Sequence, residues 1–251
     1  QRCAAARRPM GEVLSAVGCS GRPVYTDTAT WYFVRHARGT RDLGDEALEL
    51  ALPSADGPTW RPDPEPSLGR DGVQQARAMR RGWLREEGLD VDFQGDLPPK
   101  WHVVSSDTMV CMETAKSLLR LDALSVTPVP FLHTGLPAAL CDGGGAAPGA
   151  LRRHAEDPES GVREYGLQAL SEVIRTMQHA GTMDVVIVIG HAVALAAIAL
   201  ELAELRQLKA TEILLDVEQG ECTALKVSQS EAAYLGGSAG AESTRAAPAE
   251  E

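Results

Sequence analysis

The sequence predicts an α/β domain in which a mostly parallel central sheet is covered by helices on both faces. Segments suited to strands alternate with segments suited to helices along most of the chain, which is the order of a parallel sheet with crossover helices. The segment VVIVIG at residues 185–190 is continuously apolar, as in a strand buried on both faces. With 251 residues, 44% of them hydrophobic, the chain can build one substantial core.

The first elements follow an irregular start. Residues 31–34, WYFV, suit a buried strand. Residues 52–69 are rich in proline and aspartate, and that much proline excludes regular structure. Apolar residues then recur at helical spacing over residues 70–87, and Gly88 ends the pattern. We therefore expect a strand, a long excursion and a helix.

The middle of the chain repeats this order. WHVVSS at residues 101–106 predicts a second strand, and a helix is expected over residues 108–121. VTPVPFL at residues 126–132 predicts a third strand. Residues 133–158 form a Gly- and Ala-rich excursion, which we expect to lack regular structure.

The last third contains the clearest strand. A helix is expected over residues 161–180, the strand over 184–190, and a further helix over 192–209. The segments EILLDV and CTALKVS, at residues 212–217 and 222–228, predict two final strands.

These elements divide the chain into three parts. We expect an irregular N-terminal arm over residues 1–26, the α/β domain over 27–229, and a low-complexity acidic tail over 230–251. The arm begins QRCAAARRPM and contains no acidic residue in this stretch. That composition suggests the remnant of a targeting peptide for a mitochondrion or plastid, and an arbitrary boundary in a cytoplasmic protein is the alternative.

The charge of the chain limits its partners. The formal net charge of −11 argues against a nucleic-acid partner, because phosphate backbones attract basic surfaces. No segment approaches the roughly 18 apolar residues needed to span a bilayer. The five cysteines show no metal-ligand spacing, so neither a metal nor a cofactor is expected.

Two expected strands run directly into histidines. Arg35 and His36 follow the strand at 31–34, and His191 follows the strand at 184–190. Ligands of parallel α/β sheets bind beyond the carboxyl ends of the strands. An arginine matches phosphate oxygens with a planar fork of donors, a neutral imidazole can attack phosphorus, and a second imidazole can stabilise developing charge. Arg35, His36 and His191 thus contain the minimum of a phosphohistidine mechanism, and ordinary hydrogen-bonded histidines are the alternative.

The chain resembles the histidine phosphatase superfamily, which includes the phosphoglycerate mutases. The resemblance rests on four segments in the family's order: FVRHARG, LGRDGVQQARAM, VVSSDTMVCMETAKSL and VIVIGHAVALAAI. Ala37 stands where glycine is commoner in the family. The further matching positions are Leu68, Gly72, Gln75, Ala76, Ser105, Ser106, Thr114 and Ala115. This resemblance implies the phosphoglycerate mutase-like fold, with His36 as nucleophile and Arg35 and His191 as phosphate-pocket residues.

The same resemblance reveals departures from the family pattern. Val110 occupies the position of the family's second pocket arginine, and Asp42 that of its pocket asparagine. No glutamate follows the third expected strand, and Ala192, rather than an acid, follows His191. The loss of one preorganised donor costs about a hundred- to a thousandfold in rate. The resemblance therefore implies a degenerate phosphate pocket.

Nearby residues could restore what these departures remove. Arg38 and Arg41, on the loop after His36, could supply the missing charge, and His133 or Asp142 could act as the acid. Solvated side chains without a role are the alternative for each of the four.

Two functions remain open. In the first, the chain is a weakly active or inactive member of the superfamily that acts as a binding or structural subunit of a protein complex. In the second, it is a phosphomonoesterase that works through phospho-His36. Phosphate or a phosphomonoester is the expected ligand if the pocket works.

Overall fold

The computed structural model describes residues 28–39, 67–89, 97–120, 125–135, 161–177, 182–208 and 223–237. The strands within these ranges are β1 (Thr30–Arg35), β2 (Trp101–Ser105), β3 (Thr127–Pro128), β4 (Val185–Gly190), β5 (Thr223–Val227) and β6 (Ala232–Gly237). The helices are α4 (Arg70–Met79) with the π-helical turn η2 (Arg80–Leu84), α5 (Met109–Leu119), α6 (Phe131–Thr134), α9 (Val162–Thr176) and α10 (Ala192–Leu205).

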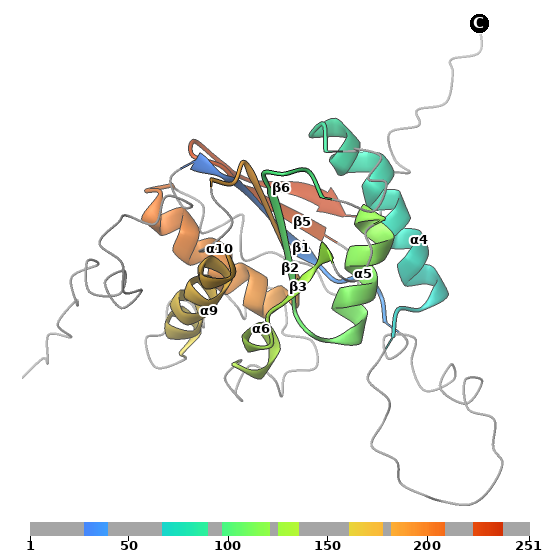
Figure 1. Cartoon of the computed structure of the whole chain (residues 1–251), viewed down its shortest axis with the longest axis horizontal. Helices are drawn as coiled ribbons and strands as arrows, with labels where there is room; N and C mark the ends of the chain where they lie inside the picture. Colours follow the sequence, from blue (N-terminus) through green and yellow to red (C-terminus); the bar gives the residue numbers. More distant parts are fainter. Residues whose placement is uncertain are drawn as a thin grey trace, which may run out of the picture.

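The strands form one sheet in the order β3-β2-β4-β1-β5-β6 (Figure 1). β1, β2, β3 and β4 are mutually parallel along their shared edges, whereas β5 and β6 are antiparallel to their neighbours. β4 lies between β2 and β1, and every one of its residues is buried. The predicted α/β fold with a mostly parallel sheet is therefore confirmed.

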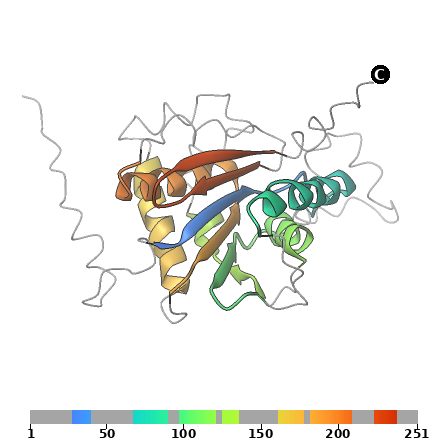
Figure 2. The same ribbon diagram turned by 90° about the horizontal axis from the view of Figure 1, so that it is seen from above.

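Helices cover both faces of the sheet. α9 and α10 lie on one face, and α4 and α5 lie on the other (Figures 1 and 2). The side chains of β1 alternate between the two resulting cores: Trp31 and Phe33 pack toward α9 and α10, and Tyr32 and Val34 pack toward α4 and α5. This alternation follows from the two-residue period of a strand.

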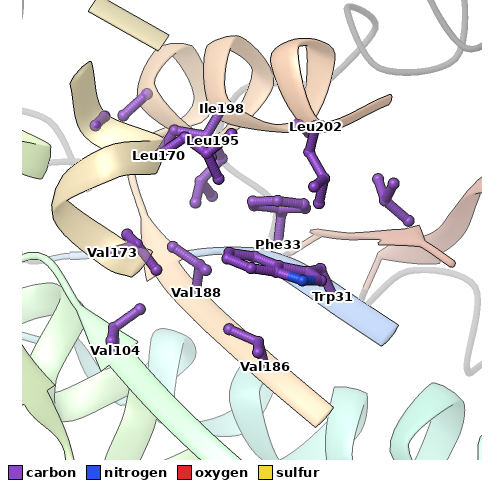
Figure 3. Packing of buried hydrophobic residues seen from close by; sticks show 14 of the residues in the cluster. Trp31, Phe33, Val104, Leu170, Val173, Val186, Val188, Leu195, Ile198 and Leu202 are labelled. Atoms are coloured by element: carbon purple, nitrogen blue, oxygen red, sulfur yellow. The ribbon is translucent and has the colours of Figure 1, made fainter. Parts of the chain in front are cut away.

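The core beneath α9 and α10 is the larger one. In Figure 3, Phe33 and Trp31 lie below α10, whose Leu195, Ile198 and Leu202 point toward the sheet. Burial of such side chains contributes roughly 1.5–3 kcal/mol each. This packing fixes α10 against β1 and β4, and so fixes the position of the residue at which α10 begins.

Two elements differ from the sequence-based expectation. The helix expected over residues 70–87 is interrupted at Gly82, whose backbone (φ −88°, ψ −111°) is not helical. The third strand, expected over residues 126–132, is reduced to Thr127–Pro128. Pro128 and Pro130 have no backbone N–H for a ladder hydrogen bond, so the chain leaves the sheet and enters α6.

The sheet continues beyond residue 229, where we expected the tail to begin. Residues 232–237 form β6, which pairs with β5 at the sheet edge. This segment still contains Tyr234 and Leu235, so its low-complexity composition begins only after them. The expected strand at residues 212–217, the arm at 1–26 and the remainder of the tail lie outside the described residues.

Candidate active site

The carboxyl ends of the four parallel strands lie at one edge of the sheet. His36 follows β1 and His191 follows β4, while Ser106 follows β2. α6, which carries His133, begins shortly after β3. Because β3, β2, β4 and β1 are consecutive neighbours, the segments after them share this edge, as the rule for ligand sites in parallel sheets requires.

Three histidine rings are close together at this edge. The ring centroids of His36 and His191 lie 4.8 Å apart, with an interplanar angle of 66°. Those of His133 and His191 lie 5.7 Å apart, with an angle of 42°. We call this group the imidazole cluster. It contains both histidines expected in the pocket and the histidine suggested as an acid.

The tautomer of His36 follows from its hydrogen bond. Its Nδ1 lies 2.9 Å from the backbone oxygen of Ala37. A carbonyl oxygen can only accept, so Nδ1 carries the proton and, in the neutral ring, Nε2 carries the lone pair. The backbone N–H of His36 donates to the oxygen of Gly190 (3.0 Å), which continues the pairing of β1 with β4. In the neutral ring, Nε2 of His36 is thus the unprotonated nitrogen.

His191 is a neutral imidazole at ordinary pH. Burial lowers its pKa to about 3, and the charges of His36, His133 and Arg35 add to this effect. The residue is also the N-cap of α10, where the positive end of the helix dipole disfavours a cation. In the site without ligand, His191 is therefore uncharged and has one N–H rather than two to offer to a phosphate oxygen.

The loop after His36 is fastened by residues of the matching segments. The backbone N–H of Ala37 donates to the hydroxyl of Thr114 (3.0 Å). The backbone N–H of Arg38 donates to the side-chain oxygen of Gln75 (3.0 Å). A Cβ at Gly72 would lie only 2.1 Å from the oxygen of Arg38, so α4 can approach this loop only with glycine there. These three residues therefore position the loop after His36.

The first turn of α5 contacts His191 in a way that the sequence did not reveal. The Nε2 of His191 lies 3.4 Å from the hydroxyl of Thr108 and 3.8 Å from the sulfur of Cys111. Val110, on the same turn, is only 3% exposed and packs in the apolar cluster beneath α4 and α5. The three-residue spacing of Thr108 and Cys111 indicates that they share one face of a helix. No pattern in the sequence indicates that this face contacts His191.

Of the arginines expected near the site, the structure describes Arg35 and Arg38. The Nε and Nη1 atoms of Arg35 are buried, and its charge contributes to the low pKa of His191. The backbone of Arg38 is held by Gln75 and Gly69. Arg41, Asp42 and Asp142 lie outside the described residues.

Neither a metal centre nor a membrane helix is found in the described part of the chain. There, no group of three or more His, Cys, Asp or Glu side chains is arranged to hold a metal ion. Over the same residues, no helix has the length and apolar character needed to cross a bilayer.

Comparison with known proteins gives a likeness of fold. The chain matches no family model and no curated protein. Among solved structures it resembles the ecdysone phosphate phosphatase of Bombix mori in complex with tungstate (18% identity, 78% of this chain and 88% of that chain, TM-score 0.48). It also resembles the phosphoglycerate mutase of Bacillus anthracis (16%, 83% and 93%, 0.45). A mycobacterial glucosyl-3-phosphoglycerate phosphatase with inorganic phosphate is a third (20%, 79% and 89%, 0.41).

At identities of 16–20%, the likeness concerns the fold and does not extend to the activity of this chain.

Proposed function

We propose that the site binds phosphomonoesters and transfers their phosphoryl group to His36, at a rate limited by its weak positive charge. The observation that carries this proposal is the 4.8 Å approach of the His36 and His191 rings at the carboxyl edge of the sheet. The hydrogen bond from Nδ1 of His36 to Ala37 supports it, because it places the lone pair of the neutral ring on Nε2, the atom that would attack. The sequence resemblance to histidine phosphatases points to the same role.

In the first step, Nε2 of His36 attacks the phosphorus of the bound ester. The N–P bond forms as the bond from phosphorus to the leaving oxygen breaks. His133, acting as the general acid, gives a proton to that oxygen, which departs as an alcohol. Its 5.7 Å ring separation from His191 supports His133 as the acid. In this scheme His133 has the role of the glutamate that the resemblance implies at this step.

In the second step, water attacks the phosphoryl group of phospho-His36. The water gives its proton to His133, the N–P bond breaks, and inorganic phosphate leaves. His36 and His133 then return to their starting states, so protons and bonds balance over the cycle. Arg35 and the N-terminus of α10 supply the positive potential for the phosphoryl oxygens.

The pocket is expected to be slow. Val110 stands at the position where the resemblance implies an arginine, and one missing donor of this kind costs about a hundred- to a thousandfold in rate. The burial of Val110 in an apolar cluster favours a second candidate, in which the chain is a binding or structural subunit with no turnover.

Hydrolysis of an activated aryl phosphate tests the proposal. We expect the wild-type protein to exceed background and the His36→Ala variant to fall to background. His102→Ala is the matched control, because His102 lies on β2, where its ring bonds the hydroxyl of Thr176 (2.8 Å). Equal rates in wild type and His36→Ala, with both folded, would rule out turnover and leave the binding subunit.

A further inference from the structure

The imidazole cluster brings two histidine rings close to a third. The ring of His191 lies 4.8 Å from that of His36 and 5.7 Å from that of His133, measured between ring centroids. His36 comes from the end of β1 and His133 from α6. The groups that act on the charge of His191 are His36, His133 and Arg35, and each of them opposes its protonation. From α5, the sulfur of Cys111 faces its Nε2 at 3.8 Å.

A doubly charged anion would reverse this balance. Each positive ring attracts such a ligand, and the ligand's charge offsets the repulsion between neighbouring protonated rings. Rings that cannot all be protonated in the empty site can share an additional proton once the anion is bound. Interacting groups of this kind titrate as a unit rather than one residue at a time.

Other features of this edge are suited to an anion. α5 and α10 begin here, and neither N-cap residue, Thr108 or His191, makes a side-chain capping hydrogen bond. Helix N-termini offer backbone N–H groups and positive potential to anions. The hydroxyl of Ser106, at the end of β2, is fully buried and has no hydrogen-bond partner among the described residues.

We propose that the imidazole cluster is a proton-sharing unit, and that a phosphate-like dianion enters the site together with a proton that the cluster takes up from the solvent. This proposal rests on the proposed function for the class of ligand, but it concerns binding rather than turnover. The proposal predicts that the affinity for a dianion depends on pH. A pocket that contained only permanently charged arginines would show no such dependence. The proposal also gives His133 a part in binding.

Sulfate is the probe that tests this coupling. It remains a dianion from about pH 5 to about pH 8, the range in which imidazoles titrate, so the protons counted on binding go to the protein. Sulfate also has no phosphoester bond to hydrolyse, so its binding can be measured without turnover. Calorimetric titration in two buffers of different ionisation enthalpy gives the number of protons taken up.

We expect the uptake of about one proton per sulfate, and an affinity that falls close to tenfold for each unit of rising pH within the coupled range. His191→Gln should abolish most of the uptake. His133→Gln, at an exposed position, should reduce it to about half. His102→Gln is the matched control and should leave it unchanged, because this ring is bonded to Thr176 on α9.

The outcomes separate this proposal from the proposed function. Sulfate binding with no proton uptake, uptake that is equal in wild type, His133→Gln and His191→Gln, or no sulfate binding at any pH would each overturn the coupling. His36-dependent hydrolysis would stand in the first two cases. If sulfate binds with proton uptake but the protein hydrolyses no aryl phosphate, the coupling is supported and the proposed turnover is contradicted.

Discussion

The hydroxyl of Thr114 accepts the backbone N–H of Ala37 at 3.0 Å and donates to the oxygen of Val110 at 2.7 Å. One side chain of α5 therefore holds the residue next to His36 and also closes a turn of its own helix. Thr114 and Ala37 are both fully buried. A buried N–H without its acceptor costs about 1–3 kcal/mol, so this contact contributes both to stability and to the position of His36.

Thr114→Val should lower the free energy of unfolding by about 1–3 kcal/mol and reduce aryl phosphate hydrolysis about tenfold or more, because a misplaced nucleophile loses its alignment. Urea unfolding and steady-state rates measure the two effects. Thr176→Val is the control, since its hydroxyl bonds Val173 and His102 on the other side of the sheet. Equal rate losses in both variants would contradict a positioning role for Thr114.

Gly72→Ala should damage the site through the loop that follows His36. The new Cβ would lie 2.1 Å from the backbone oxygen of Arg38 and 2.9 Å from Leu68, so α4 or the loop must move. Such overpacking costs about 1–3 kcal/mol. We expect a loss of stability together with weaker sulfate binding, measured by thermal unfolding and calorimetry.

Gly166→Ala is the matched control for that variant. Its Cβ would lie 2.7 Å from the backbone oxygen of Ala197, where α9 packs closely on α10. A comparable loss of stability is expected, with sulfate affinity kept. If Gly72→Ala unfolds at a lower temperature but binds sulfate as tightly as Gly166→Ala does, the loop does not depend on Gly72 in the way argued.

Val110→Arg tests whether the pocket lacks only a charge. The substituted residue lies on the first turn of α5, between Thr108 and Cys111, which both contact His191. An arginine stem can cover apolar surface while its guanidinium reaches a polar region. We expect aryl phosphate hydrolysis to rise about ten- to a hundredfold, with a loss of stability from the disturbed apolar cluster. A folded variant with an unchanged or lower rate would favour the binding subunit.

Much of the fold could be predicted from local pattern. The continuous apolar run of β4 indicates a doubly covered strand, and all six of its residues are buried. The two strand-end histidines follow from the same pattern, because the residues after parallel strands lie at one edge. The resemblance of Gly72, Gln75 and Thr114 to a family pattern was visible, but their shared role in fastening Ala37 and Arg38 needed the coordinates.

What the sequence could not give were contacts set by tertiary packing. His133 meets His191 because two prolines shorten β3 and bring the chain into α6 at that edge. Cys111 and Thr108 meet His191 because α5 packs beneath the end of β4. Neither contact has a periodic signal along the chain, since each depends on elements far apart in sequence.

The low pKa of His191 makes stability depend on pH. Its pKa is lowered from 6.5 to about 3 in the folded protein, and burial also lowers the pKa of His102. Between those values the unfolded chain binds more protons than the folded one, so the free energy of unfolding rises with pH. Within this window His191 contributes at most about 1.4 kcal/mol per pH unit. This stability is complete above about pH 6.5 and is lost as the pH falls toward 3.

Glu201 acts in the opposite direction, because burial raises the pKa of its carboxyl. The folded state then holds a proton that the unfolded state releases, and stability falls as the pH rises through that range. The contribution of His191 is therefore measured as the difference in unfolding free energy between wild type and a His191 variant, in which the effect of Glu201 cancels. Urea unfolding of wild type and His191→Gln, at several values between about pH 4 and about pH 7, should give a shallower rise in the variant. If the free energy of unfolding changes with pH equally in both proteins, His191 is protonated in the folded protein over this range. The assignment of a neutral imidazole to His191 would then be wrong.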